Sequence, residues 1–153
     1  MSAREQHGLA GLLLAVDHVG LAVRDLAAAI DFHTDVLGLE LVHQEVNEAQ
    51  GVAEAMLAAP GADPAAAQIQ LLAPLDDSSP LARFLERSGP GLQQLAYRVS
   101  DVQAASAELR GRGLRLIYDS ARPGTRGSRI NFVHPQDTGG VLIELVEVVE
   151  RQR

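Results

Sequence analysis

Short segments of the chain alternate apolar and polar residues, and the first of them leads into a helical pattern. In segment 18–23, His-Val-Gly-Leu-Ala-Val, the period is close to two, which predicts a half-buried strand. An Ala-rich stretch follows over residues 26–36, directly after Asp25, a residue type that caps helices. Gly38 follows this stretch, where a left-handed turn costs little. The pattern therefore predicts a strand and then a helix.

The same pattern recurs later in the chain. Segment 18–26 aligns with segment 94–102 at an offset of 76 residues, and the second copy leads through Asp101 into a predicted helix over 102–112. Another pair of segments, 67–72 and 141–146, aligns at an offset of 74 residues. Two matches nearly in register indicate an internal duplication.

Each half reads as a strand, a helix and three further strands. The further strands are expected at 39–46, 51–59 and 67–72, and at 114–118, 128–134 and 141–146. An amphipathic linker helix is expected over 79–89, between the halves. We therefore expect an α+β fold of two βαβββ modules, 15–75 and 91–149, related by a pseudo-twofold axis. With an N-terminal extension at 1–14, they form a single domain over 1–153.

Composition narrows the class of function. A length of 153 residues with 46% hydrophobic content suits one compact core. A net charge of -7 and 3% aromatic residues argue against a nucleic-acid partner, and every apolar run is too short to span a membrane. The chain has no Cys, which excludes disulfides, thiolate zinc sites and a thiol nucleophile, and suits a cytoplasmic location.

Four polar residues interrupt apolar strands at equivalent positions. His18 is equivalent to Gln94, and Gln70 to Glu144, and the alternation turns all four side chains inward. One nitrogen donor, two amide oxygens and one carboxylate suit cobalt, manganese, nickel or magnesium better than a closed zinc site. The alternative is that each group is simply hydrogen-bonded at a strand end.

Charge limits what such a site could do. One carboxylate does not neutralise a divalent ion, so the site favours an anionic chelating substrate and an oxyanion formed from it. A single His argues against the arrangement of two His and one carboxylate used by non-haem iron oxygenases. Removal of a proton next to a carbonyl group fits better.

Several of these segments resemble one known family. They are 18–23, 43–57, 70–75, 89–96 and 134–145, and the segment 43–57 is the most specific of them. Together they look like methylmalonyl-CoA epimerases, which belong to the vicinal-oxygen-chelate, or glyoxalase-like, superfamily. The resemblance covers nearly everything from residue 17 to residue 147.

This resemblance implies an isomerase of propionate metabolism that interconverts (R)- and (S)-methylmalonyl-CoA. Removal of the C2 proton would give an enediolate whose charge a divalent metal ion stabilises, with cobalt as the foremost candidate. Carried over by motif, His18, Gln70 and Glu144 are metal ligands and Glu54 is a general base. Glu144 or a water is the candidate second acid, and a homodimer is the expected assembly.

The sequence leaves the roles of Glu54 and Gln94 open. Glu54 lies in an otherwise apolar strand, where burial would raise its proton affinity towards the range useful for acid–base catalysis, although an outward-facing edge glutamate fits the pattern equally. At Gln94 the chain departs from the family, which usually carries a His pair where this chain has Gln93 and Gln94. The fourth ligand is then a weaker oxygen donor or is absent.

Other hypotheses about the function and about individual residues stay open. One is a metal-free protein of the same fold that sequesters a small molecule, and another is an isomerase or lyase acting on a different malonyl or glutathione thioester. A group of arginines in a Gly-rich loop could meet CoA phosphates or be a solvated surface: Arg122, Arg126 and Arg129. Asn47 and Gln50 could contact substrate or shape a turn, and His134 precedes a proline at a predicted strand end.

Overall fold

The computed structural model describes residues 7–149, which divide into two compact units. The first unit is His18–Gln93, and the second contains the described residues 7–17 and 94–149. Strand β1 (Leu13–Ala22) begins in the second unit and ends in the first. Residues 1–6 of the predicted N-terminal extension lie outside the described residues.

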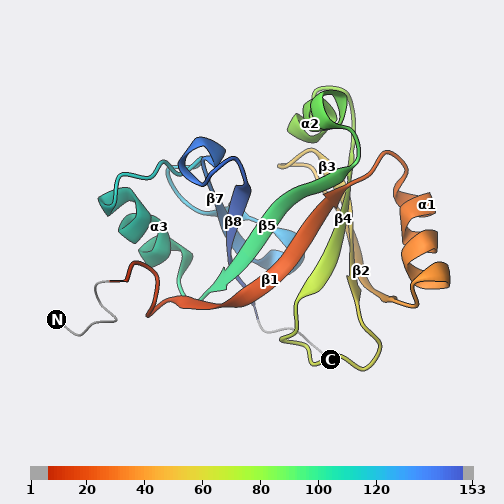
Figure 1. Cartoon of the computed structure of the whole chain (residues 1–153), viewed down its shortest axis with the longest axis horizontal. Coiled ribbons are helices and arrows are strands. Elements are labelled where there is room, and N and C mark those ends of the chain that lie inside the picture. The colour runs from red at the N-terminus through yellow and green to blue at the C-terminus, as the bar shows by residue number, and fades with distance from the viewer. Residues whose placement is uncertain (1–6, 150–153) are drawn as a thin grey trace. The chain divides into compact units, whose positions relative to one another are not determined.

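The first unit contains one βαβββ module and the linker helix (Figure 1). Its elements after β1 are α1 (Leu26–Asp31) with a π-helical turn (Phe32–Val36), β2 (Glu40–Asn47), β3 (Val52–Ala58), β4 (Gln68–Pro74) and α2 (Pro80–Ser88). The strand order is β2-β3-β4-β1, and β1 runs parallel to β4 while the other pairs are antiparallel.

The two faces of this sheet are buried differently. On one face, Leu57 and Leu71 pack against Leu26 and other apolar residues of α1. On the other face, Leu72 packs with Leu81 and Leu85 of α2. Helix α1 therefore covers the first face, and α2 covers only part of the second, the face we call the site face.

The second unit repeats this arrangement. Its elements are β5 (Gly91–Val99), α3 (Val102–Gly111), β6 (Arg122–Pro123), β7 (Arg129–Val133) and β8 (Leu142–Glu147), in the strand order β6-β7-β8-β5. Residues Val99, Val133 and Leu145 pack against Val102 and Ala105 of α3. The face opposite α3, which carries Gln94 and Glu144, is the site face of this unit.

The predicted helix starts and stops are confirmed. Asp25 Oδ1 accepts a hydrogen bond of 3.0 Å from the backbone N–H of Ala28, and Asp101 Oδ1 accepts one of 3.0 Å from Ala104. The chain leaves these helices through Gly38 and Gly113, whose φ values are 79° and 88°. Both glycines therefore adopt the left-handed conformation that the sequence indicated.

The strand predicted at 114–118 is wrong. This segment forms a single bridge, between Leu116 and Val133, and the short strand β6 follows it instead. Asn131 supplies the reason, because its side chain accepts from the N–H of Tyr118 at 3.1 Å and donates to the Tyr118 carbonyl at 3.0 Å. A buried side-chain amide thus replaces the backbone partner that a regular ladder would provide.

The α+β class and the two βαβββ modules are confirmed by the element order and topology of each unit. That the two units fold together as one domain stays a prediction. Among the described residues, no helix is both long enough and apolar enough to cross a membrane.

Candidate active site

Three predicted site residues lie on the site face of the first unit. Strand pairing defines this face, because Gln70 of β4 stands between Gly20 of β1 and Met56 of β3. Side chains alternate along each strand, so His18, Gln70 and Glu54 all point to the same side. Each of the three is 3% exposed. The expectation that His18 and Gln70 turn inward is confirmed.

Glu54 and Gln70 are joined directly. The Gln70 Nε2 donates a hydrogen bond of 2.9 Å to Glu54 Oε2, within a buried environment. This bond fixes the orientation of the carboxylate and commits the amide nitrogen, so Oε1 is the lone-pair donor that Gln70 can offer a cation. The alternative of an outward-facing glutamate is therefore wrong for Glu54.

The second unit holds the other two predicted residues. Ala96 stands opposite Glu144, and Gln94 stands opposite Leu142, so Gln94 and Glu144 share one face. The Gln94 Nε2 donates a hydrogen bond of 2.7 Å to Glu144 Oε2, and both side chains are at least nine-tenths buried. Each unit therefore contains one carboxylate held by a glutamine amide.

The predicted ligands suit a divalent cation only if their amide oxygens also take part. Within residues 7–149, no group of three or more His, Cys, Asp and Glu side chains is arranged so that it could hold a metal ion. The predicted ligand set contains only two residues of these types, His18 and Glu144, so amide oxygens would complete it. Imidazole, amide and carboxylate groups are the donor types that cobalt, manganese, nickel and magnesium accept.

The structure also contains a buried ion pair that the sequence analysis missed. In the second unit, Arg98 Nε donates to Asp17 Oδ1 at 2.9 Å, and Asp17 is 2% exposed. The two residues are 81 positions apart, so no local pattern connects them. The one available signal was a charged residue directly before His18 in an apolar strand.

Two polar neighbours of the predicted site were also missed. Gln68 stands opposite His18 and is buried, and among the described residues its Oε1 has no hydrogen-bond partner. Glu45 stands opposite Glu54, and its Oε1 lies 2.9 Å from Nε2 of His43. The same alternation that singled out Gln70 could have found Gln68, two positions earlier.

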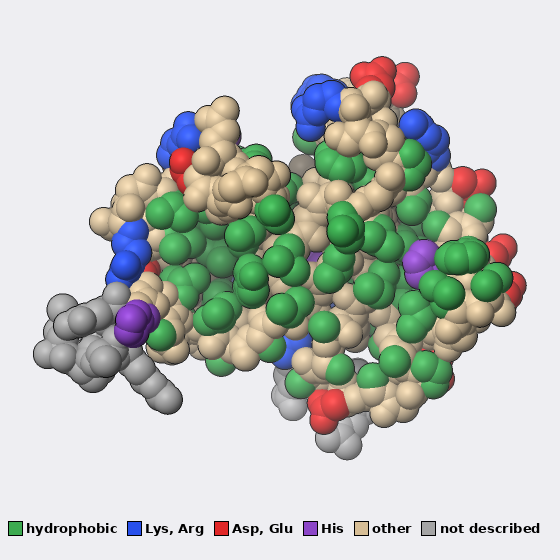
Figure 2. All heavy atoms as spheres, viewed as in Figure 1, with side chains coloured by type: hydrophobic (Ala, Val, Ile, Leu, Met, Phe, Trp, Pro, Cys, Tyr) green, Lys and Arg blue, Asp and Glu red, His purple; other side chains and the backbone are tan. Residues whose placement is uncertain are grey.

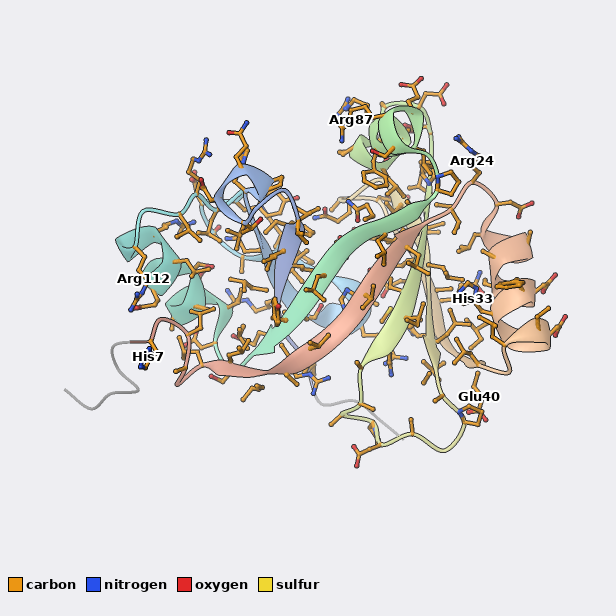
Figure 3. The ribbon with its side chains drawn as sticks, in the orientation of Figure 1. His7, Arg24, His33, Glu40, Arg87 and Arg112 are labelled. Carbon is orange, nitrogen blue, oxygen red and sulfur yellow. The ribbon has the colours of Figure 1, made fainter. Side chains whose placement is uncertain are left out.

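Other candidate residues have local partners. Asn47 accepts a hydrogen bond of 3.1 Å from the N–H of Gln50, and His134 accepts one of 3.2 Å from the N–H of Gln136, so both shape turns. His33 lies between its helix and the strands of the first unit, and its Nδ1 is 2.7 Å from the Ala29 carbonyl oxygen (Figure 3). The guanidinium of Arg122 lies 4.7 Å from the centre of the Tyr118 ring.

The sequence matches the profile of the Glyoxalase/Bleomycin resistance protein/Dioxygenase superfamily over residues 17–132. The chain therefore belongs to this superfamily, and the predicted glyoxalase-like fold is confirmed.

Individual relatives narrow the class. The crystal structure of methylmalonyl-CoA epimerase from Mycobacterium tuberculosis is 58% identical, with a TM-score of 0.86 over 91% of each chain. A methylmalonyl-CoA epimerase in complex with methylmalonyl-CoA and ammonium is 43% identical, with a TM-score of 0.85 over 90% of this chain and 96% of the other. The ethylmalonyl-CoA/methylmalonyl-CoA epimerase of Cereibacter sphaeroides is 35% identical over 87% of this chain and 97% of its own.

The chain belongs to the methylmalonyl-CoA epimerase family. Both the resemblance seen in the sequence and the prediction of an isomerase-class enzyme of this family are thereby confirmed.

Proposed function

We propose that this enzyme interconverts (R)- and (S)-methylmalonyl-CoA by removing and returning the proton at C2. The observation that carries the proposal is Glu54, a buried carboxylate that Gln70 orients on the same face as His18. Relatives of this chain that cover nearly its whole length are epimerases of this substrate.

In this mechanism Glu54 is the general base. Its carboxylate takes the C2 proton, and the electron pair of the C–H bond delocalises into the thioester to give an enediolate. The N–H of Gln70 holds the Glu54 carboxylate in one orientation. The base therefore loses less conformational freedom when the reaction reaches its transition state. Charge-assisted hydrogen bonds of this kind are stronger than neutral ones, so the orientation is well defined.

Glu144 is the proposed acid for the opposite face of the substrate. The N–H of Gln94 holds its carboxylate as Gln70 holds Glu54. Return of a proton from Glu144 to C2 gives the other stereoisomer, whereas return from Glu54 regenerates the starting one. A water is the alternative donor for this step.

A divalent metal ion belongs to the proposal, with His18, Gln70, Gln94 and Glu144 as its ligands. Cobalt is the first candidate, and manganese, nickel and magnesium are the others. When bound, such an ion stabilises negative charge that develops on substrate oxygens. Because Gln94 offers an amide oxygen where the family usually has an imidazole, we expect a weaker site than in relatives with the His pair.

The deciding experiment is solvent exchange at C2 in deuterium oxide, followed by mass spectrometry and by resolution of the two stereoisomers. With cobalt added, the wild type should exchange the proton and epimerise the substrate. Glu54→Gln should lose both activities by a factor of about 10² to 10⁴, because a general base contributes that much.

Cobalt binding by Glu54→Gln, measured by calorimetry, is the control, and it should match the wild type because Glu54 is not a proposed ligand. The exposed Glu40, at the start of β2, provides a matched substitution, Glu40→Gln, that should leave exchange unchanged (Figure 3). A wild type with cobalt that exchanges no C2 proton would overturn the proposal.

A metal-free binding protein of the same fold is the second candidate. The amide at Gln94 favours it, because a protein of this fold that no longer binds a metal is expected to have lost one of the usual ligands. Tight thioester binding without exchange, with or without cobalt, would support it over the epimerase. Exchange with another malonyl or glutathione thioester, but not with methylmalonyl-CoA, would support a different reaction on the same scaffold.

Assembly and location are also proposals. Hydrophobic side chains are widespread on the face seen in Figure 2. Three apolar residues of β1 are exposed: Leu13, Leu14 and Val16. A homodimer would bury apolar surface of this kind, and light scattering after gel filtration would detect it. A cytoplasmic location and a role in propionate metabolism are further parts of the proposal, supported by the Cys-free composition and by the family, and cell fractionation tests the location.

A further inference from the structure

The proposed base is buried, so its proton needs a route to and from water. Glu54 is 3% exposed. A carboxyl group that keeps the proton it has removed can only return that same proton. Exchange of the C2 hydrogen with solvent therefore depends on groups that connect Glu54 with the surface.

Strand β2 places such groups beside Glu54. Glu45 stands directly opposite Glu54 in the antiparallel pair of β2 and β3, and His43 stands opposite Met56. Directly opposite residues in such a pair share a face and have Cβ atoms about 4.5–5.5 Å apart. The carboxyl groups of Glu45 and Glu54 are thus within reach of each other, directly or through one water.

The burial along β2 confirms which side these residues face. His43, Glu45 and Asn47 are half-buried, whereas Gln44 and Val46 between them are exposed. The three half-buried side chains therefore lie on the site face, where Glu54 is.

His43 extends the row of polar groups towards water. Its Nε2 lies 2.9 Å from Glu45 Oε1, and the two side chains are 31% and 30% exposed. Exposure therefore rises from Glu54 to the pair formed by Glu45 and His43. On its other side Glu54 accepts the hydrogen bond from Gln70.

We propose that Glu45 and His43 carry protons between Glu54 and solvent. The inference rests on the proposed epimerase function, in which Glu54 is the base. Glu45 and His43 act through Glu54 and not on the substrate, so they are relay residues.

The transfer balances in protons and charge. The O–H bond of protonated Glu54 breaks as an O–H bond forms on the Glu45 carboxylate. Glu45 then passes its proton to one ring nitrogen of His43, and the imidazolium releases the proton of its other nitrogen to water. Both carboxylates end ionised, His43 ends neutral, and one proton has reached solvent. The reverse sequence delivers a deuteron when the solvent is deuterium oxide.

The test compares two rates on the same sample. Epimerisation of methylmalonyl-CoA is followed in deuterium oxide at low conversion, and deuterium is counted both in recovered substrate and in product. In Glu45→Gln the ratio of deuterium in recovered substrate to epimerisation should fall by about ten-fold, because the proton stays on Glu54 and returns to C2. Glu45→Asp, which keeps a carboxylate, should recover most of the ratio.

His43 gives an independent measurement. His43→Ala should lower the same ratio, and added imidazole should restore it, because a free base can replace the lost side chain. A purely structural role of His43 would not respond to imidazole. Glu40→Gln is the matched control, since it removes an exposed carboxylate of the same strand and should leave the ratio unchanged.

The outcomes separate the two proposals. If the wild type neither epimerises nor exchanges, the proposed function is wrong. If the wild type is active and Glu45→Gln lowers exchange and epimerisation in parallel, or neither of them, Glu45 is not a relay and this inference is overturned.

Discussion

The two units share one framework but differ in the residues that it carries. Register equates Gln70 with Glu144, since Met56 stands opposite the former and Phe132 opposite the latter. By the same register, Ile130 occupies in the second unit the position that Glu54 has in the first. Gln68 likewise corresponds to Leu142. The first unit therefore carries a carboxylate and an amide, Glu54 and Gln68, at two positions where the second unit has apolar residues.

This asymmetry suits a reaction on a substrate without symmetry. Ile130 is apolar where Glu54 is acidic, so the second unit has no carboxylate at this position. The duplicated framework thus keeps polar residues at the paired positions 18 and 94 and at 70 and 144, while positions 54 and 130 differ.

The largest expected effect is on the buried ion pair, which the first unit lacks. Ala22 is the first-unit equivalent of Arg98, and Gln93 is the equivalent of Asp17. Asp17→Ala leaves the buried Arg98 guanidinium without its carboxylate, and should lower the free energy of unfolding by about 3–5 kcal/mol. Urea denaturation measures this change.

The matched substitution is Gln93→Ala, which should change the free energy of unfolding by less than about 1 kcal/mol. Equal losses for Asp17→Ala and Gln93→Ala would mean that the ion pair does not distinguish the units.

The next effect concerns the proposed ligands at equivalent positions 18 and 94. His18→Gln gives both units an amide at this position, and should weaken cobalt binding by about 100-fold or more, since even residues behind the ligands contribute 10- to 100-fold. Gln94→His gives both units an imidazole and should tighten binding. Titration calorimetry with cobalt compares the variants, and wild-type affinity in His18→Gln would remove His18 from the ligand set.

A smaller effect should separate the two capped helices. Asp25→Ala removes the side-chain acceptor at the start of α1, and should cost about 1 kcal/mol of stability. Asp101→Ala should cost less, because Glu147 Oε1 also accepts a hydrogen bond of 2.9 Å from the Val102 N–H at the start of α3. Thermal and urea unfolding of both variants give the comparison, and a larger loss in Asp101→Ala would contradict it.

The smallest effect is the contribution of Asp137, in the second unit, to the pH dependence of stability. The Arg115 side chain donates to Asp137 at 3.0 Å and lowers the pKa of that carboxyl from 3.8 to about 2. A lowered pKa in the folded state means that the ionised form stabilises the protein above pH 4. That stability is lost as the pH falls towards 2. Because Arg115 is more than half exposed, solvent screening keeps the effect small.

NMR titration of Asp137 checks this pH dependence. The pKa should rise towards its ordinary value in Arg115→Gln, and an unchanged titration would show that another group sets it.

Much of this organisation could be predicted from local patterns. Alternation placed His18, Gln70, Gln94 and Glu144 among buried positions, because side chains in a strand alternate whatever surrounds the sheet. Aspartates and glycines marked the ends of α1 and α3, because capping and left-handed turns depend on a few neighbouring residues. The resemblance in segment 43–57 identified Glu54 as the candidate base, whereas the hydrophobic pattern alone left open whether its side chain faces inward or outward.

Other features depended on residues distant in the sequence. The strand expected at 114–118 does not form, because the Asn131 side chain takes the place of a backbone partner for Tyr118. No residue close to Tyr118 in the sequence indicates this contact. The pairing of Asp17 with Arg98 joins residues 81 positions apart. The hydrogen bonds from Gln70 to Glu54 and from Gln94 to Glu144 likewise required the registers of neighbouring strands.

The sequence by itself determined the two βαβββ modules, the ends of their helices and the side of each strand on which its polar residues lie. These properties follow from periods of two and of 3.6 residues and from local hydrogen bonding. The tertiary structure decided which polar side chains meet: Gln70 with Glu54, Gln94 with Glu144, and Arg98 with Asp17. Strand register sets these contacts, and a register is fixed only when whole strands pack.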